Sequence, residues 1–133
     1  MKFYISAKWQ LVEEVRKIHK LLKEKGHEIT EDWTLHNCVK PYDKDVKVSN
    51  ELAKKDIQGV LNADVYVLLS DNKGIGKYIE LGAALASNVL AGKPLIYVIG
   101  SLNNQSQFYF HPEVRLKRNF DEVLEEVDKL GVK

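Results

Sequence analysis

The chain has 133 residues and a mass of 15.2 kDa, and 44% of its residues are apolar, which predicts one globular domain over residues 1–133. Twenty Lys and Arg against 19 Asp and Glu give a formal net charge of +1, so the charge balance does not favour a nucleic-acid partner. The apolar runs are far shorter than the roughly 20 residues that a membrane span needs, so we expect no membrane partner. Cys38 is the single cysteine, which is typical of a reducing, cytoplasmic setting and excludes an internal disulfide.

Segments with strand and helix patterns alternate along the chain. In chain order, apolar and β-favouring runs predict strands over 2–6, 27–33, 65–69, 95–99 and 114–116, and helical spacing predicts helices over 11–22, 46–62, 76–90 and 120–130. Two segments without a period, 34–45 and 101–112, predict surface loops. The nearly continuous apolar run at 65–69 predicts a central strand that is covered on both faces.

This alternation predicts an α/β fold with a parallel sheet and right-handed crossovers. With five strands we expect a flavodoxin-like three-layer sandwich with the strand order 2-1-3-4-5. In that order a ligand crevice lies at the carboxyl ends of strands 1 and 3. Three loops should converge there, namely 6–9, 70–79 and the segment from Gly100 onward.

Glu80 is the first candidate catalytic residue. It lies in the first turns of a helix whose entry carries Gly74 and Gly76, and glycines allow a backbone to approach a ligand closely. Two ordinary explanations stay open, because strand-to-helix turns often use glycine and acids near helix N-termini are favoured anyway. The apolar and small residues around Glu80 favour the functional interpretation, because a carboxylate among them is costly unless it faces a cleft or a partner.

Asp56 is the second candidate. It shares a helical stripe with Leu52, Gly59 and Val60, where a charge is out of place on a core-facing surface. The alternative is an acid at the edge of the stripe that pairs with a neighbouring lysine or faces solvent. Asp64 precedes the predicted central strand at its amino end, so we expect a turn-stabilising role for it.

Three segments together resemble the nucleoside 2-deoxyribosyltransferase superfamily, which includes 2'-deoxynucleoside 5'-monophosphate N-glycosidases. They are Phe3-Tyr4-Ile5-Ser6-Ala7, the stretch from Asp56 to Ala63-Asp64, and the glycine-led stretch from Gly76 to Glu80-Leu81-Gly82. The likeness covers roughly residues 2–100. The chain is also similar to a branch of small proteins with Gly26-His27-Glu28-Ile29-Thr30, Asp32-Trp33-Thr34 and an aromatic segment ending in His111-Pro112.

The resemblance implies that Glu80 attacks the anomeric carbon of a sugar and that Asp56 positions the sugar or transfers a proton. It implies a nucleoside or nucleotide as the small-molecule ligand, and we expect neither a cofactor nor a metal. Two positions depart from the pattern: Lys77 stands where a small or hydroxyl residue is common, and Gly74 stands where transferases place an aspartate.

Further candidate ligand-binding residues lie at the predicted strand ends. Ser6, Lys8 and the backbone amides from Gly74 to Lys77 can hold a 5'-hydroxyl or 5'-phosphate, and Trp9 and Trp33 can stack on a base. Lys8 can equally be a solvated surface lysine, and the tryptophans can serve packing alone. The full set of predicted substrate-binding residues is Tyr4, Ser6, Lys8, Trp9, Trp33, Asp71, Gly74, Gly76, Lys77 and Ser106.

The histidines carry less weight. His19 lies among Lys17, Lys20 and Lys23 and is expected on the surface, and His36 shares an irregular loop with Cys38. No third ligand with zinc-site spacing accompanies that pair in the sequence. We expect His111 to be structural or to lie at a subunit contact.

Three functions remain open from the sequence. The first is N-glycosidic-bond hydrolysis or 2-deoxyribosyl transfer, the second a nucleotide-binding sensor without turnover, and the third a TIR-like protein that processes NAD or a nucleotide. The aromatic run Phe108-Tyr109-Phe110 would form an unusual apolar patch on a monomer. We therefore expect a homodimer or larger homo-oligomer with the 101–112 loop at or near the contact.

Overall fold

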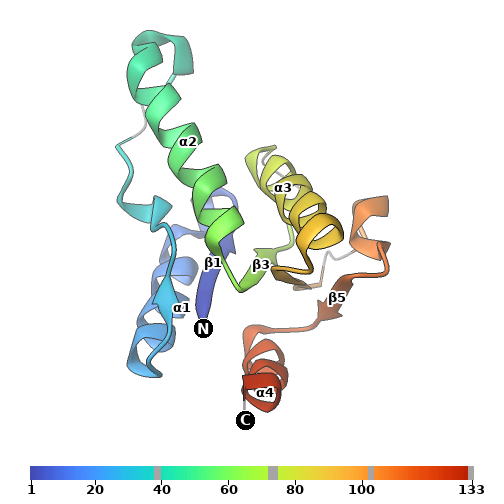
Figure 1. Ribbon diagram of the computed structural model, residues 1–133. Coiled ribbons are helices and arrows are strands. Elements are labelled where there is room, and N and C mark those ends of the chain that lie inside the picture. Colours follow the sequence, from blue (N-terminus) through green and yellow to red (C-terminus); the bar gives the residue numbers. More distant parts are fainter. Residues whose placement is uncertain (38–39, 72–74, 102–103, 132–133) are drawn as a thin grey trace.

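The computed structural model describes residues 1–37, 40–71, 75–101 and 104–131. In it, five parallel strands form a sheet with the order β2-β1-β3-β4-β5 (Figure 1). The strands are β1 (Lys2–Ser6), β2 (Glu28–Ile29), β3 (Val65–Leu69), β4 (Leu95–Ile99) and β5 (Val114–Lys117). The α/β class and the flavodoxin-like strand order predicted from the sequence are confirmed.

Four α-helices flank the described part of this sheet: α1 (Val12–Glu24), α2 (Val46–Asn62), α3 (Gly76–Ala91) and α4 (Phe120–Gly131). Short 3-10 turns, η1 (Trp9–Leu11), η2 (Trp33–Leu35), η3 (Tyr42–Asp45) and η4 (Gln107–Phe110), shape the connections. Over the described ranges, none of the helices combines the length and the apolar character needed to cross a bilayer.

The register of the strands decides which side chains face which helices. Tyr4 pairs with Tyr66 across β1 and β3, and their rings are stacked 6.1 Å apart. The Tyr66 hydroxyl donates to the Lys77 carbonyl at 3.2 Å, so this face lies against α3. Since side chains alternate along a strand, Ser6 lies on the same face as Tyr4, at the carboxyl end of β1.

Helix α2 lies beside α3 on that face (Figure 1). Its approach to β1 depends on Gly59, where an added Cβ would lie 2.6 Å from the Glu31 Cβ and 3.0 Å from the Tyr4 ring. The Thr30 hydroxyl donates to the Gly59 carbonyl at 2.6 Å. The glycine therefore allows the segment after β2 to pack directly against α2.

All five residues of β3 are buried, which confirms the central strand expected from its apolar run. The opposite face of the sheet is covered by α4, whose Glu126 accepts a hydrogen bond of 2.5 Å from the Tyr97 hydroxyl of β4. Asp64 accepts from the backbone amide of Lys2 at 2.9 Å, in keeping with its expected role at the amino end of the sheet.

Two expectations are wrong, one about the segment near Trp33 and one about His19 of α1. The strand expected over 27–33 is only two residues long, because Asp32 accepts from the Thr34 amide and starts η2. His19 is buried rather than exposed, with 3% of its surface accessible, because α1 turns it inward beside Val15 and Leu22. Its Nδ1 lies 3.4 Å from the Asp32 carboxylate.

Candidate active site

Glu80 and Ser6 meet where the sheet ends. The register directs Ser6 toward α3, and Glu80 lies in the second turn of that helix. The Ser6 hydroxyl donates to Oε1 of Glu80 at 2.8 Å. Burial raises the pKa of Glu80 to about 7, against the stabilising hydrogen bond from Ser6, and nearby Asp56 raises it further. The carboxylate thus changes its protonation state close to neutral pH.

Tyr4 lies beneath this carboxylate and is fully buried. Burial raises the pKa of its hydroxyl above the ordinary range, and the nearby charges of Glu80 and Asp56 raise it further. The hydroxyl therefore stays protonated and can only donate or accept as a neutral group. Tyr4 therefore places an uncharged hydroxyl near both Glu80 and Asp56.

Asp56 reaches the same region from α2. Burial raises the pKa of its carboxyl to about 6, the charge of Glu31 adds to that rise, and His36 opposes it. Oδ1 of Asp56 is shielded from solvent and has no hydrogen-bond partner. Neither of the neighbouring lysines expected from the sequence is its closest charged contact, because the helix turns the carboxylate toward the segment after β2.

His36 belongs to this cluster and was missed by the sequence reasoning. Its Nε2 lies 2.9 Å from Oε2 of Glu31, and its Nδ1 lies 3.7 Å from Oδ1 of Asp56. The imidazole therefore sits between two carboxylates, one from the segment after β2 and one from α2. The only signal in the sequence was a histidine in a loop without a period, which does not show what the loop packs against.

A second charged cluster lies at the carboxyl end of β3. Nζ of Lys8 forms a 2.9 Å ion pair with the Asp71 carboxylate, and Nζ of Lys77 donates to the Asp71 carbonyl at 2.8 Å. The Lys77 side chain is buried, and burial together with the charge of Lys8 lowers its pKa, while Asp71 opposes that change. Two ammonium groups thus converge beside the N-terminus of α3.

The two tryptophans form a pair at the end of β1. The indole of Trp33 is buried and donates to the Ile5 carbonyl at 2.6 Å, which fixes it against the end of β1. Trp9 lies on it with the ring centres 5.8 Å apart and is 46% exposed. Trp33 therefore has a packing role, whereas the exposed face of Trp9 is open to a ligand.

The remaining predicted residues fall in different places. Gly76 is the first residue of α3, and Gly74 and Cys38 lie outside the described residues. Ser106 caps η4 by accepting from the Phe108 amide at 3.2 Å, so the structure places its hydroxyl in the loop rather than in the carboxylate cluster. In the aromatic run, Phe108 and Phe110 are exposed and Tyr109 is buried.

Tyr109 brings the third loop to the site. Its ring lies 6.2 Å from that of Tyr78, and burial, Tyr78 and the charge of Asp71 raise the pKa of its hydroxyl. The loops after β1, β3 and β4 therefore converge at one end of the sheet, as the strand order predicts.

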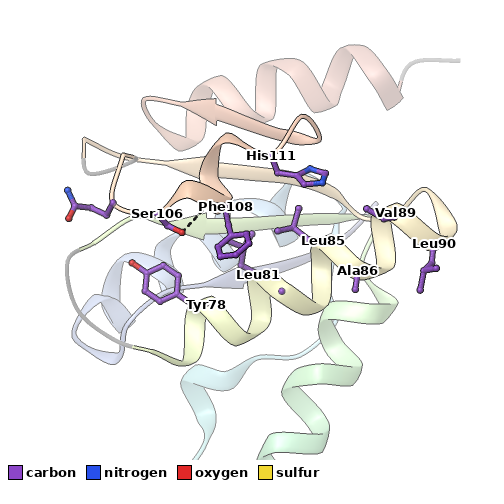
Figure 2. Close-up of a pocket in the computed structure, with 11 residues that line it drawn as sticks. Tyr78, Leu81, Leu85, Ala86, Val89, Leu90, Ser106, Phe108 and His111 are labelled. Atoms are coloured by element: carbon purple, nitrogen blue, oxygen red, sulfur yellow. Dashed lines mark hydrogen bonds between the residues drawn. The ribbon is translucent and has the colours of Figure 1, made fainter.

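A separate apolar groove of about 780 Å³ runs along the outer face of α3 (Figure 2). Tyr78, Leu81, Leu85, Ala86, Val89 and Leu90 line it from the helix, and Ser106, Phe108 and His111 line it from the loop around η4. Lys77 lies with its Nζ 5.3 Å from the Tyr78 ring, so this tyrosine stands between the groove and the charged cluster. Across the described ranges, no group of three or more His, Cys, Asp or Glu side chains could hold a metal ion.

The fold can be compared with known proteins. No family model matches the chain, and no curated protein matches its sequence. Among solved structures, the chain is similar to the Clostridium botulinum CMP N-glycosidase BcmB, with a TM-score of 0.59 and 16% sequence identity. The match covers 96% of this chain and 99% of that chain. The two proteins therefore share their fold over nearly their whole lengths.

Proposed function

We propose that this protein cleaves the N-glycosidic bond of a nucleoside 5'-monophosphate, with Glu80 as the nucleophile. The observation that carries the proposal is a half-buried Glu80, held by Ser6, with a second carboxylate from α2 close enough to raise its pKa. The sequence resemblance to 2-deoxyribosyltransferases and N-glycosidases supports it. The fold shared with a CMP N-glycosidase supports it as well.

The chemistry proceeds in two steps. First the bond between C1' and the base nitrogen breaks, Glu80 forms a bond to C1', and the departing base takes the proton of Asp56. Water then attacks C1', the bond to Glu80 breaks, and the proton that water loses returns to Asp56. A second base in place of water would give transfer instead of hydrolysis.

Lys8 and Lys77 favour a substrate that carries a phosphate. Both ammonium groups converge at Asp71 beside the N-terminus of α3, where backbone amides and the helix dipole also attract anions. A 5'-phosphate placed there would compete with Asp71 for Lys8. The Trp9 ring is 46% exposed and packs on Trp33 at the end of β1, so it can stack on the base.

A binding module without turnover is the second candidate. It is favoured by Lys77, which stands where relatives of the proposed class commonly have a small or hydroxyl residue and which fills the space beside Asp71 with its buried side chain. Such a module would bind a nucleotide and release no base.

The test is incubation of the protein with CMP, dCMP, cytidine and NAD, followed by chromatography for free base. We expect base release from a nucleoside monophosphate. Glu80→Gln should lower the rate by at least about 10²-fold, and Asp56→Asn by about 10-fold to 10³-fold. Glu125→Gln, the same change on the exposed face of α4, is the matched control and should keep full activity.

Two outcomes contradict the proposal. Full activity of Glu80→Gln excludes the nucleophile, and binding of CMP without release of cytosine from any substrate favours the binding module. Lys8→Met tests the phosphate site, because loss of a charged contact should raise the KM for CMP by roughly 10-fold and leave that for cytidine unchanged.

We also propose that the protein acts as a homodimer through the outer face of α3. Residues 81–91 of this helix carry no charge, and Val89 and Leu90 are 65% and 87% exposed beside the groove. The same face thus carries exposed apolar side chains and an apolar groove in which Gly82 and Ala86 leave space. The exposed side chains of one copy can therefore pack into the groove of a second copy around a two-fold axis. The η4 loop, which lines the groove, would then lie at the contact.

A further inference from the structure

We infer that Ser6 is a positioning residue that gives the two oxygens of Glu80 different roles: its hydroxyl holds Oε1 and leaves Oε2 to attack C1'. This inference rests on the proposed function, in which Glu80 is the nucleophile. It adds the identity of the attacking atom and the step of the reaction that Ser6 assists.

The contact between Ser6 and Glu80 is fixed from both sides. Ser6 is fully buried and pairs with Leu68 across β1 and β3, so its hydroxyl has no access to solvent. Lys77 lies about one helical turn before Glu80, and its carbonyl accepts from the Tyr66 hydroxyl of β3 at 3.2 Å. The sheet therefore holds both partners of the 2.8 Å hydrogen bond from Ser6 to Oε1.

The two oxygens of Glu80 have different surroundings. Among the residues that the structure describes, the Ser6 hydroxyl is the only hydrogen-bond donor to Glu80, and it contacts Oε1. The Tyr4 hydroxyl lies near the carboxylate without the geometry of a hydrogen bond. A donated hydrogen bond stabilises charge on the oxygen that accepts it, which makes Oε1 the poorer nucleophile. Oε2 is therefore the atom that forms the bond to C1'.

The same hydrogen bond favours the second step of the reaction. Once Oε2 is bonded to C1', Oε1 is a neutral carbonyl oxygen. When water attacks C1', its proton goes to Asp56, the bond between C1' and Oε2 breaks, and the electron pair of that bond returns to the carboxylate. Part of the negative charge then develops on Oε1, where the Ser6 hydroxyl stabilises it. Ser6 thus assists the departure of Glu80 from the sugar.

Three titratable groups from three other elements face Glu80 within the described ranges, namely Tyr4 of β1, Tyr66 of β3 and Asp56 of α2. Burial raises the pKa values of both tyrosines above the ordinary range, so they stay uncharged. Asp56 raises the pKa of Glu80, whereas the hydrogen bond from Ser6 lowers it. Loss of the Ser6 hydroxyl should therefore move the titration of Glu80 to higher pH.

The first test is titration of the Glu80 carboxyl by NMR in ¹³C-labelled protein. In Ser6→Ala its midpoint should lie at higher pH than in the wild type. Ser6→Cys has a side chain of similar size and a weaker donor, so its midpoint should lie between the two. Ser49→Ala removes a hydroxyl that donates to the Tyr42 carbonyl and should leave the midpoint unchanged. Equal midpoints in the wild type and in both Ser6 variants would overturn the inference, and Ser6→Cys decides the matter if Ser6→Ala does not fold.

The second test measures the covalent intermediate during turnover of CMP. Charge on Oε1 falls in the first step and returns in the second, so Ser6→Ala should slow the second step by about 10-fold to 10²-fold. Intact-protein mass spectrometry should then show a larger fraction of the protein with the sugar phosphate attached than in the wild type or in Ser49→Ala. Slower turnover without an increase in that fraction would show that Ser6 does not assist the departure of Glu80.

The titration needs no substrate, so it separates this inference from the proposed function. If the wild type releases no base from any substrate, the proposed function fails, and a Glu80 midpoint that depends on Ser6 still shows that Ser6 holds the carboxylate. If base is released and the midpoint does not depend on Ser6, this inference fails alone.

Discussion

At the scale of the residue, Glu80 and Asp56 should give the proposed reaction a narrow pH optimum. The nucleophile must be ionised, so activity should rise with pH as Glu80 loses its proton near its pKa of about 7. The acid must be protonated, and Asp56 loses its proton near its pKa of about 6. Because the pKa of Glu80 is the higher of the two, the competent combination of charges is a minor state, and its population peaks between the two pKa values. We expect a bell-shaped profile of kcat/KM with its maximum between pH 6 and 7, measured as base release from CMP. A flat profile from pH 5 to 8 would contradict these assignments.

The raised pKa of Glu80 also predicts its effect on stability. Folding disfavours the charged form of a carboxyl group whose pKa is higher in the folded state. Below its ordinary pKa of 4.5 the Glu80 carboxyl is protonated in both states and costs no stability, and the cost grows as the pH rises to about 7. Glu80→Gln keeps the acceptor for Ser6 and removes the charge. It should increase the free energy of unfolding by about 1 to 3 kcal/mol at pH 8 and change it little at pH 4. Denaturant unfolding at both pH values measures this, and a loss of stability at pH 8 would contradict it.

At the scale of the element, the contact of α2 with β1 and the segment after β2 depends on Gly59. In Gly59→Ala the new methyl group would meet the Glu31 Cβ at 2.6 Å and the Tyr4 ring at 3.0 Å. We expect a loss of about 1 to 3 kcal/mol in the free energy of unfolding, because backbone or ring must move. Gly82→Ala on α3, where no atom lies within 4 Å of the added Cβ, is the matched control. It should gain roughly 0.5 to 1 kcal/mol from helix propensity, so equal effects of the two substitutions would contradict the close approach.

The elements also show how far the sequence could predict the structure. The strands and helices could be predicted because each type of element buries apolar residues at its own period. The short crossover connections between them then permit only a few strand orders. His19 was misjudged because three lysines surround it in sequence. Its spacing from Val15 and Leu22, four and three residues, places it on the buried stripe of α1 and was the better signal.

The candidate site was predictable only in part, for a related reason. Glu80 and Asp56 stand out as charges among apolar residues on regular helices, so periodicity exposes them. His36 lies in a loop without a period, and its neighbour Asp56 comes 20 residues later in the chain. Contacts made by irregular segments depend on where the chain folds back, and a single sequence carries no sign of that.

At the scale of the whole molecule, the proposed dimer predicts a change in mass from one surface substitution. Leu90 is 87% exposed, so Leu90→Lys should leave the fold of one chain intact. Between two copies it would bury an unpaired charge, and we expect the dimer to dissociate. Leu35→Lys, at a position 76% exposed on η2, is the matched control and should remain dimeric. Sedimentation of the wild type at 15.2 kDa at micromolar concentration would contradict the dimer.

The strand order has a consequence for synthesis of the chain on the ribosome. Because β1 lies between β2 and β3, the residue Phe3 finds its partner Val65 only after 62 further residues have been made. Until then β1 has one open edge, and its apolar side chains have no α2 or α3 to cover them. Such long sequence separations slow folding and lengthen the exposure of unpaired edges to other chains. A nascent chain that ends before β3 should therefore depend on chaperones. The shortest chain in which the central strand β3 can pair on both sides is one whose β4 has left the ribosome.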